Sequence, residues 1–181
     1  SLLVNFHDPM VACVTGLTMP VELESYGQIT FEKYSPFGKG FMRREFNTIN
    51  RNPLATGIVG AGANMAIRKT IVSEIGSFDE VLDAGTMTKS GGDHEYFSRI
   101  LVSGHSIIYD PRALSWHRHR RTWKETKDAI KGYGVGIYAF WTRSLLVEKE
   151  LGILKLAWFW FVKTQLPNVL RCLLRKPGRP H

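Results

Sequence analysis

A helical pattern that runs directly into an apolar, strand-like segment constrains this chain more than any other feature. From Asp93 onward, the apolar residues Phe97, Ile100 and Leu101 fall at helical spacing, and Gly104 marks the end of the helix. The strand-like segment HSIIYDP, residues 105–111, follows at once. Because a helix and a strand joined this closely are typical of proteins that layer helices on a sheet, we expect a mixed α/β fold.

Other segments extend this pattern in both directions. MVACVTG, residues 10–16, predicts a buried strand closed by glycine, and ANMAIRK, residues 63–69, is strand-like. KTIVSEI, residues 69–75, predicts a short helix, and the following Gly76 is a usual helix-ending signal. The polar and aromatic residues 26–46 predict irregular structure instead.

The later part of the chain becomes helical. ALSWHRHR, residues 113–120, predicts a further strand. Residues 121–147 have a helical pattern that we expect Gly132, Gly134 and Gly136 to interrupt, because glycine lowers helix stability. We therefore expect an α/β domain over residues 1–147 and a helical tail over residues 148–181.

Composition and cysteine usage exclude several classes of protein. Hydrophobic residues make up 44% of the chain and charged residues 22%, which excludes a disordered or fibrous protein. Cys13 and Cys172 lie far apart and form no CxxC motif. This pattern favours a reducing compartment and argues against both a disulfide scaffold and a cysteine-ligated zinc site.

The net charge of +8 is concentrated in two places. Residues 112–131 carry seven Lys and Arg against two acidic residues, and residues 163–181 carry five and no acidic residue. Such patches predict local contacts with anions, for example phosphates or lipid headgroups. No nucleic-acid recognition motif accompanies them, so we do not expect a nucleic-acid partner.

Asp93 has two interpretations. Aspartate is a favoured N-cap residue, because its side chain accepts a hydrogen bond from an unpaired N–H group of the first helical turn. Alternatively, Asp93 is a general base, because Gly91 and Gly92 before it carry no side chains that would shield its carboxylate from a substrate. Glu95 supplies a second carboxylate two residues later.

The small-residue segment GAGAN, residues 60–64, is a weak match to a phosphate-binding loop. It lacks the third glycine of a dinucleotide-binding motif, and no Gly-Lys-Ser or Gly-Lys-Thr follows it. The glycines are better explained by close approach of the backbone to a ligand or to another strand. Asn64 is a candidate for a hydrogen bond to a sugar hydroxyl, with stabilisation of a turn as the favoured alternative.

Several segments together resemble the later half of the inverting family 2 glycosyltransferases. The resemblance runs from about Leu3 to Tyr138, and its order and spacing make it more specific than any single motif. The segments that carry it are VACVTGLTMPVELES, GAGANMAIRK, EIGSFDEVLDAGT, SGGDHEYFSRIL and YDPRALSWHRHRR.

The resemblance implies a partial GT-A fold, which is Rossmann-like and typical of nucleotide-diphospho-sugar transferases, with a mixed sheet over residues 1–147. It also implies transfer of a sugar from a nucleotide-diphosphate donor to an acceptor hydroxyl with inversion. In that family an acidic residue that opens a helix beside the acceptor acts as the base. The resemblance assigns this role to Asp93, with Glu95 as the second candidate. It places Gly91 and Gly92 among the residues that contact the substrate. Gly92 stands where the family often has its first acidic residue.

The segment SWHRHRR is the candidate region for the leaving diphosphate. If residues 116–120 are extended, His117 and His119 share one face. Some relatives use a histidine in the place of His117 as a metal or diphosphate ligand, and Arg120 and Arg121 are candidate phosphate contacts because guanidinium groups bind oxyanions bidentately. A solvated basic rim and a two-histidine zinc site are the alternatives, and a third zinc ligand is not obvious.

The resemblance also implies a donor side that this chain lacks. The family holds the donor diphosphate and a divalent metal, Mg or Mn, with an Asp-x-Asp motif, and no two aspartates here have that spacing. We therefore expect the chain to be the acceptor-side part of a longer protein, inactive alone. The family places it in polysaccharide biosynthesis for the cell envelope, with a nucleotide-sugar donor and a carbohydrate or lipid-linked acceptor. We expect it in the cytoplasm, with the inner face of the cell membrane as a further location.

The tail predicts contacts of its own. The uncharged apolar run over residues 156–162 is too short to span a membrane, which takes about 20 residues. Residues 151–174 either pack on the domain or on a second copy of the chain, which is the favoured interpretation, or lie in a membrane interface. A non-catalytic module that binds a membrane surface, a polyanion or a protein partner through the basic patches and this tail is the alternative to an enzyme.

Overall fold

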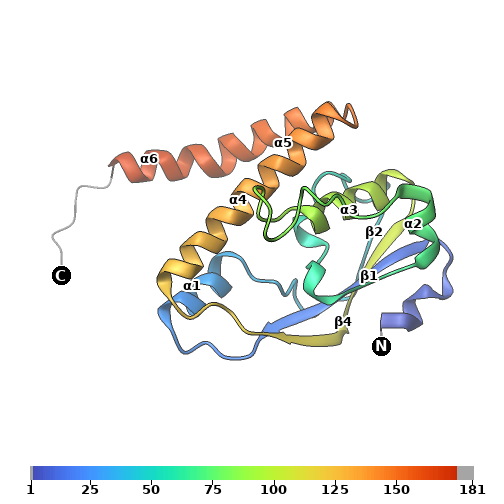
Figure 1. Cartoon of the computed structure of the whole chain (residues 1–181), viewed down its shortest axis with the longest axis horizontal. Helices are drawn as coiled ribbons and strands as arrows, with labels where there is room; N and C mark the ends of the chain where they lie inside the picture. The colour runs from blue at the N-terminus through green and yellow to red at the C-terminus, as the bar shows by residue number, and fades with distance from the viewer. Residues whose placement is uncertain (1, 175–181) are drawn as a thin grey trace. The chain divides into compact units, whose positions relative to one another are not determined.

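The computed structural model describes residues 2–174 and divides the chain into two compact units, Ser1–Thr142 and Arg143–His181. The first unit contains a four-stranded sheet with helices, and the second contains helices that follow one another along the chain (Figure 1). The predicted mixed α/β organisation with C-terminal helices is confirmed.

The sheet is mixed and has the strand order β2-β4-β1-β3. Its two central strands, β1 (Val11–Pro20) and β4 (Ser106–His117), are parallel. The short outer strands, β2 (Arg44–Phe46) and β3 (Met65–Ile67), pair antiparallel with β4 and β1 respectively. The first eight residues of β1 are buried, as expected of a parallel strand that is covered on both faces.

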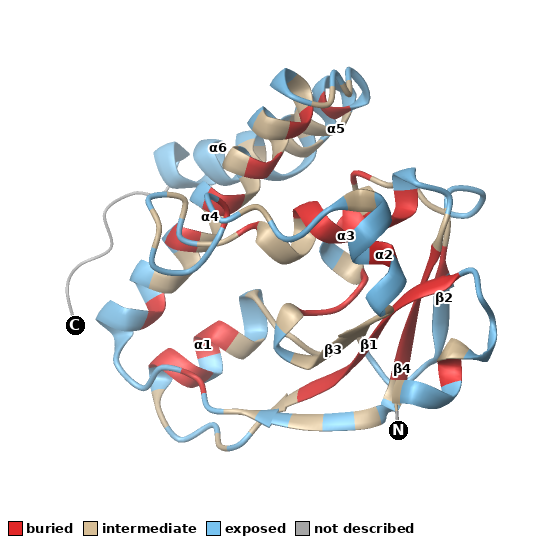
Figure 2. Ribbon diagram, turned by 45° about the vertical axis from the view of Figure 1, so that its right-hand side comes forward, coloured by how far each residue is buried: buried red, intermediate tan, exposed pale blue. Residues whose placement is uncertain are grey.

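Helix α3 (Gly92–Val102) supplies much of the core. Tyr96, Phe97, Ile100 and Leu101 are fully buried and cluster with residues of β1 and β4, so the apolar spacing correctly predicted this helix and its buried face (Figure 2). Helix α2 (Lys69–Ile75) also matches its prediction. It ends at Gly76, whose φ of 82° is a conformation that glycine adopts at little cost. A 3-10 segment, η1 (Leu2–His7), places Leu2 and Phe6 against a smaller cluster on the sheet.

The prediction of irregular structure over residues 26–46 was wrong. Helix α1 (Tyr26–Tyr34) and strand β2 lie there. A capping box starts α1: the Ser25 hydroxyl accepts from the Gln28 amide at 3.2 Å, and the Gln28 side chain accepts from the Ser25 amide at 3.1 Å. This reciprocal pairing satisfies two N–H groups that a helix start leaves free, and it offsets the weak apolar periodicity of the segment.

The prediction that glycines interrupt the last helix of the domain was also wrong, because α4 (Trp123–Leu146) is continuous. A Cβ on Gly136 would lie 2.1 Å from the Ser90 hydroxyl, and a Cβ on Gly91 would lie 2.6 Å from the Gly136 carbonyl. The Ser90 hydroxyl donates to the Gly132 carbonyl at 3.2 Å. Gly132 and Gly136 therefore let the loop before α3 pack closely on α4.

The second unit contains α5 (Gly152–Trp160), a π-helical turn η4 (Phe161–Gln165) and α6 (Leu166–Leu174). The wider turn lies just before Pro167, where the missing N–H group removes one helical hydrogen bond. Among the described residues, no helix has both the length and the apolar character that a membrane crossing requires.

Candidate functional site

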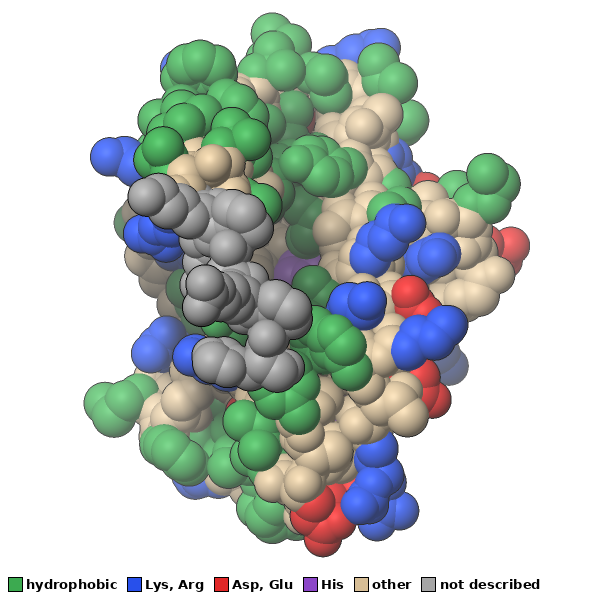
Figure 3. Space-filling model, turned by 90° about the vertical axis from the view of Figure 1, so that its left-hand side faces the viewer, with side chains coloured by type: hydrophobic (Ala, Val, Ile, Leu, Met, Phe, Trp, Pro, Cys, Tyr) green, Lys and Arg blue, Asp and Glu red, His purple; other side chains and the backbone are tan. Residues whose placement is uncertain are grey.

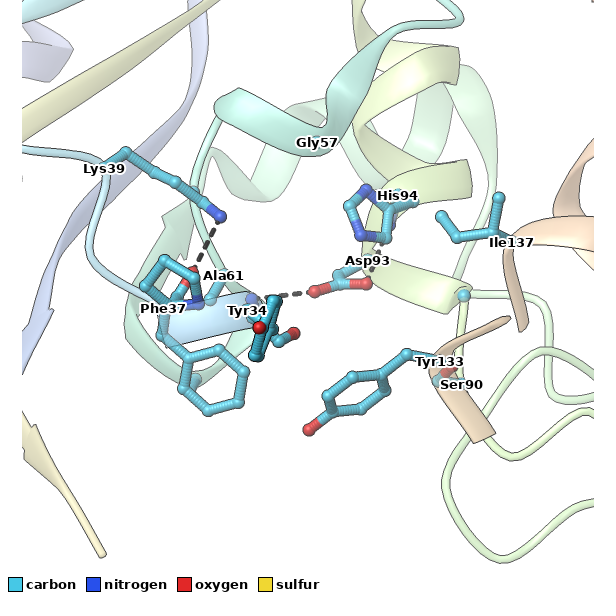
Figure 4. Close-up of a pocket in the computed structure, with 16 residues that line it drawn as sticks. Tyr34, Phe37, Lys39, Gly57, Ala61, Ser90, Asp93, His94, Tyr133 and Ile137 are labelled. Atoms are coloured by element: carbon cyan, nitrogen blue, oxygen red, sulfur yellow. Dashed lines mark hydrogen bonds between the residues drawn. The ribbon is translucent and has the colours of Figure 1, made fainter. Parts of the chain in front are cut away.

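A pocket of about 410 Å³ lies at the N-terminal end of α3 (Figure 4). Four parts of the first unit form its walls: the end of α1 with the loop after it, the segment before β3, the start of α3 and one side of α4. We call it the aromatic pocket, because it contains Tyr34, Phe37 and Tyr133. Its lining residues are 34–37, 39, 57, 60–63, 90, 91, 93, 94, 133 and 137.

Asp93 lies in the first turn of α3, and the N-cap position belongs to Gly91. One carboxylate oxygen of Asp93 accepts from the Gly62 amide at 3.0 Å, and the other accepts from the His94 amide at 2.9 Å. A carboxylate has about four acceptor positions, so these two bonds leave acceptor capacity for a ligand. The side chain is partly exposed and lines the aromatic pocket.

A second hollow of about 480 Å³ meets the aromatic pocket at this carboxylate. We call it the acidic groove, because Asp79, Glu80 and Asp83 line it. The residues common to both hollows are Gly62, Ser90, Gly91, Asp93 and Tyr133. Asp93 therefore lines both hollows.

Glycines bring the backbone close to the carboxylate and to the sheet. A Cβ on Gly62 would lie 3.1 Å from the Asp93 Cβ, and a Cβ on Gly60 would lie 2.4 Å from that of Thr15 in β1. The predicted close approach of this segment to another strand is confirmed at Gly60. Gly91 and Gly92 also lie against the chain itself: a Cβ on Gly92 would lie 2.5 Å from the Leu82 carbonyl oxygen.

Lys39 and His94 complete the polar lining of the aromatic pocket, and neither was a candidate from the sequence. Burial lowers the pKa of Lys39, and the nearby Asp93 and Glu32 carboxylates partly restore it. The Lys39 ammonium donates to the Pro36 carbonyl at 3.0 Å, and Figure 4 shows it on the same side of the pocket as Phe37. Burial likewise lowers the pKa of His94, whose Nδ1 lies 3.0 Å from the Thr56 hydroxyl. The lowered pKa favours the neutral form of the His94 imidazole.

Glu95, the second candidate base, occupies a different environment. Its side chain is fully buried and accepts two hydrogen bonds from Arg99, at 2.6 and 2.9 Å. Arg99 also donates to the Ile75 carbonyl and, at 2.8 Å, to the Ser77 carbonyl. Glu95 does not line either hollow. Glu95 therefore has a structural role: it holds the Arg99 side chain, which in turn binds carbonyl groups at the end of α2 and in the loop after it.

Asn64 bridges the two central strands. Its side-chain amide donates to the Leu17 carbonyl at 3.0 Å and to the Ala113 carbonyl at 2.8 Å. These carbonyls lie where the pairing of β1 with β4 jumps from Gly16 opposite Asp110 to Leu17 opposite Leu114. The shift leaves strand carbonyls without their usual partners, and the Asn64 amide satisfies two of them. Asn64 is thus placed as a sheet stabiliser and lies outside the lining of both hollows.

His117 and His119 point to the same side, as predicted, with their Nδ1 atoms 3.2 Å apart. His119 is buried beside Phe31, and its Nε2 lies 2.9 Å from a Glu32 carboxylate oxygen. Burial lowers the pKa of His117, and His119 and Arg120 lower it further. Within residues 2–174 no three His, Cys, Asp or Glu side chains are arranged to hold a metal ion. The side chains of residues 2–174 do not form a metal site by themselves.

The two candidate phosphate contacts differ in their surroundings. Arg120 is exposed and lines the acidic groove. Burial of Tyr133 raises the pKa of its hydroxyl, and the charge of Arg120 partly opposes that rise. Arg121 pairs with Glu24 at 2.6 Å on the surface. Arg120 therefore lines the same groove as Asp93, whereas Arg121 pairs with Glu24 in the loop before α1.

The candidate site residues from the sequence separate into two groups. One group lines the two hollows and consists of Asp93, Gly91, Gly92 and Arg120. The other group makes contacts within the protein and consists of Glu95, Asn64 and Arg121.

Comparisons of the chain with family models, with curated proteins and with solved structures found no match.

Proposed function

We propose that this chain is the acceptor-side part of an inverting glycosyltransferase and that Asp93 is its general base. One observation carries the proposal: Asp93 lines two hollows, and its carboxylate oxygens retain hydrogen-bond acceptor positions that the protein does not use. Aromatic walls with a few polar groups are typical of sites for small organic ligands. The resemblance of the sequence to family 2 glycosyltransferases supports sugar transfer as the reaction.

In this reaction the acceptor hydroxyl donates a hydrogen bond to a free acceptor position on Asp93. Its oxygen forms a bond to the anomeric carbon, and the bond from that carbon to the donor diphosphate breaks, with the electron pair leaving on the diphosphate. The hydroxyl proton passes to Asp93. A base positioned in this way contributes about 10²- to 10⁴-fold to the rate.

The hydrogen bonds from Gly62 and His94 hold the Asp93 carboxylate in place before substrate arrives. Such preorganisation matters, because reacting groups must lie within hydrogen-bond reach and in a fixed orientation. Lys39 lines the aromatic pocket, and Lys89 and Arg120 line the acidic groove. They favour binding of an anionic group of a substrate.

The proposal also covers the fold and the donor-binding part of the enzyme. The mixed sheet with α3 at the base would be the later part of a GT-A, Rossmann-like domain. The donor diphosphate and a Mg or Mn ion would be held mainly by residues that this chain does not contain. His117 would be this chain's candidate ligand to the metal or the diphosphate, and Arg120 a candidate contact to the diphosphate. We propose a location in the cytoplasm, at the inner face of the membrane where lipid-linked acceptors are found.

The test is the substitution Asp93→Asn in a longer protein that includes the donor-binding part. We expect transfer, measured by product mass, to fall by about 10²-fold or more, because Asn cannot accept the proton. Donor binding, measured by calorimetry, should stay unchanged. Asp128→Asn is the matched control, because Asp128 is an exposed partner of Lys124 on α4. Unchanged turnover in Asp93→Asn would remove Asp93 from the mechanism and favour the non-catalytic interaction module.

A further inference from the structure

Helix α6 exposes a complete apolar face. Leu166, Val169, Leu170 and Leu173 recur at spacings of three and four residues and so lie on one side of the helix, with Leu174 at its edge. All five are exposed, and Leu173 and Leu174 reach 76% and 80%. No residue of α6 is buried. A helix with this pattern normally hides its apolar face against another surface.

The preceding helix adds aromatic side chains to the apolar surface of the second unit. In α5 and η4, Trp158, Phe159 and Phe161 are exposed, Trp158 by 68%. Tryptophan is enriched where a membrane meets water, because its ring is apolar and its N–H group remains able to bond water or headgroups. Figure 3 shows hydrophobic side chains gathered in the upper part of the molecule's face, with Lys and Arg side chains around them.

Charge indicates what covers this surface. Residues 151–174 contain Lys155, Lys163 and Arg171 and no acidic residue. Two copies of the same helix pair facing each other across a twofold axis would bring these cations together without an acidic partner. An anionic lipid surface instead attracts each of them, and an amphipathic helix with Lys, Arg and Trp typically lies in such an interface.

We propose that the second unit docks on an anionic lipid bilayer, with the apolar face of α6 inserted below the headgroups and Lys163 and Arg171 at their level. The inference does not depend on the proposed sugar transfer. In this arrangement α6 lies along the bilayer surface and does not cross the membrane.

The test uses the whole chain and two kinds of vesicle, one of pure phosphatidylcholine and one in which part of the lipid is phosphatidylglycerol. We expect co-sedimentation with the anionic vesicles only, reversed by salt. The double variant Leu170→Gln/Leu173→Gln should bind at least about tenfold more weakly, because each leucine loses its favourable transfer from water. The double variant Lys163→Gln/Arg171→Gln should lose about fivefold for each charge removed.

The matched control is Asn168→Gln, on the opposite side of α6 from the leucines. It should bind like the unchanged chain. Because no α6 side chain is buried, none of these variants should alter thermal unfolding of the first unit, and circular dichroism checks this. Two results would overturn the proposal: vesicle binding that the leucine variant retains, or no vesicle binding together with a dimer that the leucine variant dissociates in sedimentation equilibrium. The second result would identify another copy of the chain as the occupant.

Discussion

The first unit and helix α6 contain similar apolar side chains in opposite surroundings. In α3, Phe97, Ile100 and Leu101 are fully buried against the sheet, whereas in α6 the leucines of one face are exposed (Figure 2). Both helices have apolar residues at helical spacing. Amphipathic spacing therefore predicts a helix and the face that it covers, but not whether the covering surface belongs to the same chain.

The contrast has a direct consequence for stability. A core side chain contributes to the folded state of its own unit, and truncating it leaves a cavity. An exposed apolar side chain contributes little until its partner arrives. Substitutions in the two regions should accordingly separate effects on stability from effects on binding.

The variant Phe97→Ala should lower the free energy of unfolding by about 3–5 kcal/mol, because it removes a fully buried ring from the core cluster of α3 and the sheet. Leu173→Ala, the matched change in α6, should alter it by less than about 0.5 kcal/mol, because the side chain is already 76% exposed. Urea unfolding followed by circular dichroism measures both. Equal effects in the two variants would mean that α6 is covered within the free chain.

The variant Glu95→Gln tests the difference between the two carboxylates in the first turn of α3, Asp93 and Glu95. We expect a loss of about 3 kcal/mol, because Arg99 would be left without its buried carboxylate. Asp93→Asn should change stability far less, since Asp93 is partly exposed. In the longer protein, Glu95→Gln should retain transfer at temperatures where it is folded. A stable but inactive Glu95→Gln protein would contradict the structural role and return Glu95 to the catalytic candidates.

The pH dependence of stability is the smallest of the expected effects. Burial lowers the pKa of His94 below its ordinary value of 6.5, although Asp93 opposes this shift. As the pH falls below about 6.5, the unfolded chain binds a proton that the folded chain still excludes, so the free energy of unfolding should fall by up to ~1.4 kcal/mol per pH unit. The fall stops below the lowered pKa of the folded state.

Urea unfolding of the unchanged chain and of His94→Gln at a series of pH values measures this slope. The glutamine variant retains a polar group near Thr56 but does not titrate, so its slope should be smaller between pH 6.5 and the lowered pKa. Identical slopes in the two proteins would show that His94 does not take up the proton.

Parts of the candidate site could be predicted from the sequence because they depend on residues close together along the chain. The helix after Gly91, its buried face at Phe97 and Ile100, and the common side of His117 and His119 all follow from local periodicity. The start of α1 is also encoded locally, in the capping pair Ser25 and Gln28, although the apolar spacing of the segment is too weak to predict a helix.

Other parts could not be predicted because they depend on which segments meet. Lys39 and Asp93 are far apart in sequence, and no spacing rule places both in one pocket. Gly136 looks like a helix breaker in sequence. In the fold it is the position where the Ser90 loop packs on α4, and this packing outweighs the low helix propensity of glycine.

Periodicity and helix-end signals act within a few residues of chain, so they were enough to predict the α/β class, the helix that carries Asp93 and the helical tail. Packing of distant segments placed Asp93 in the lining of two hollows, buried Glu95 beside Arg99, and set the Asn64 side chain across the shift between the central strands. Burial and long-range hydrogen bonds arise only when distant segments close around one another, and these contacts distinguish a carboxylate that lines two hollows from one that holds the fold together.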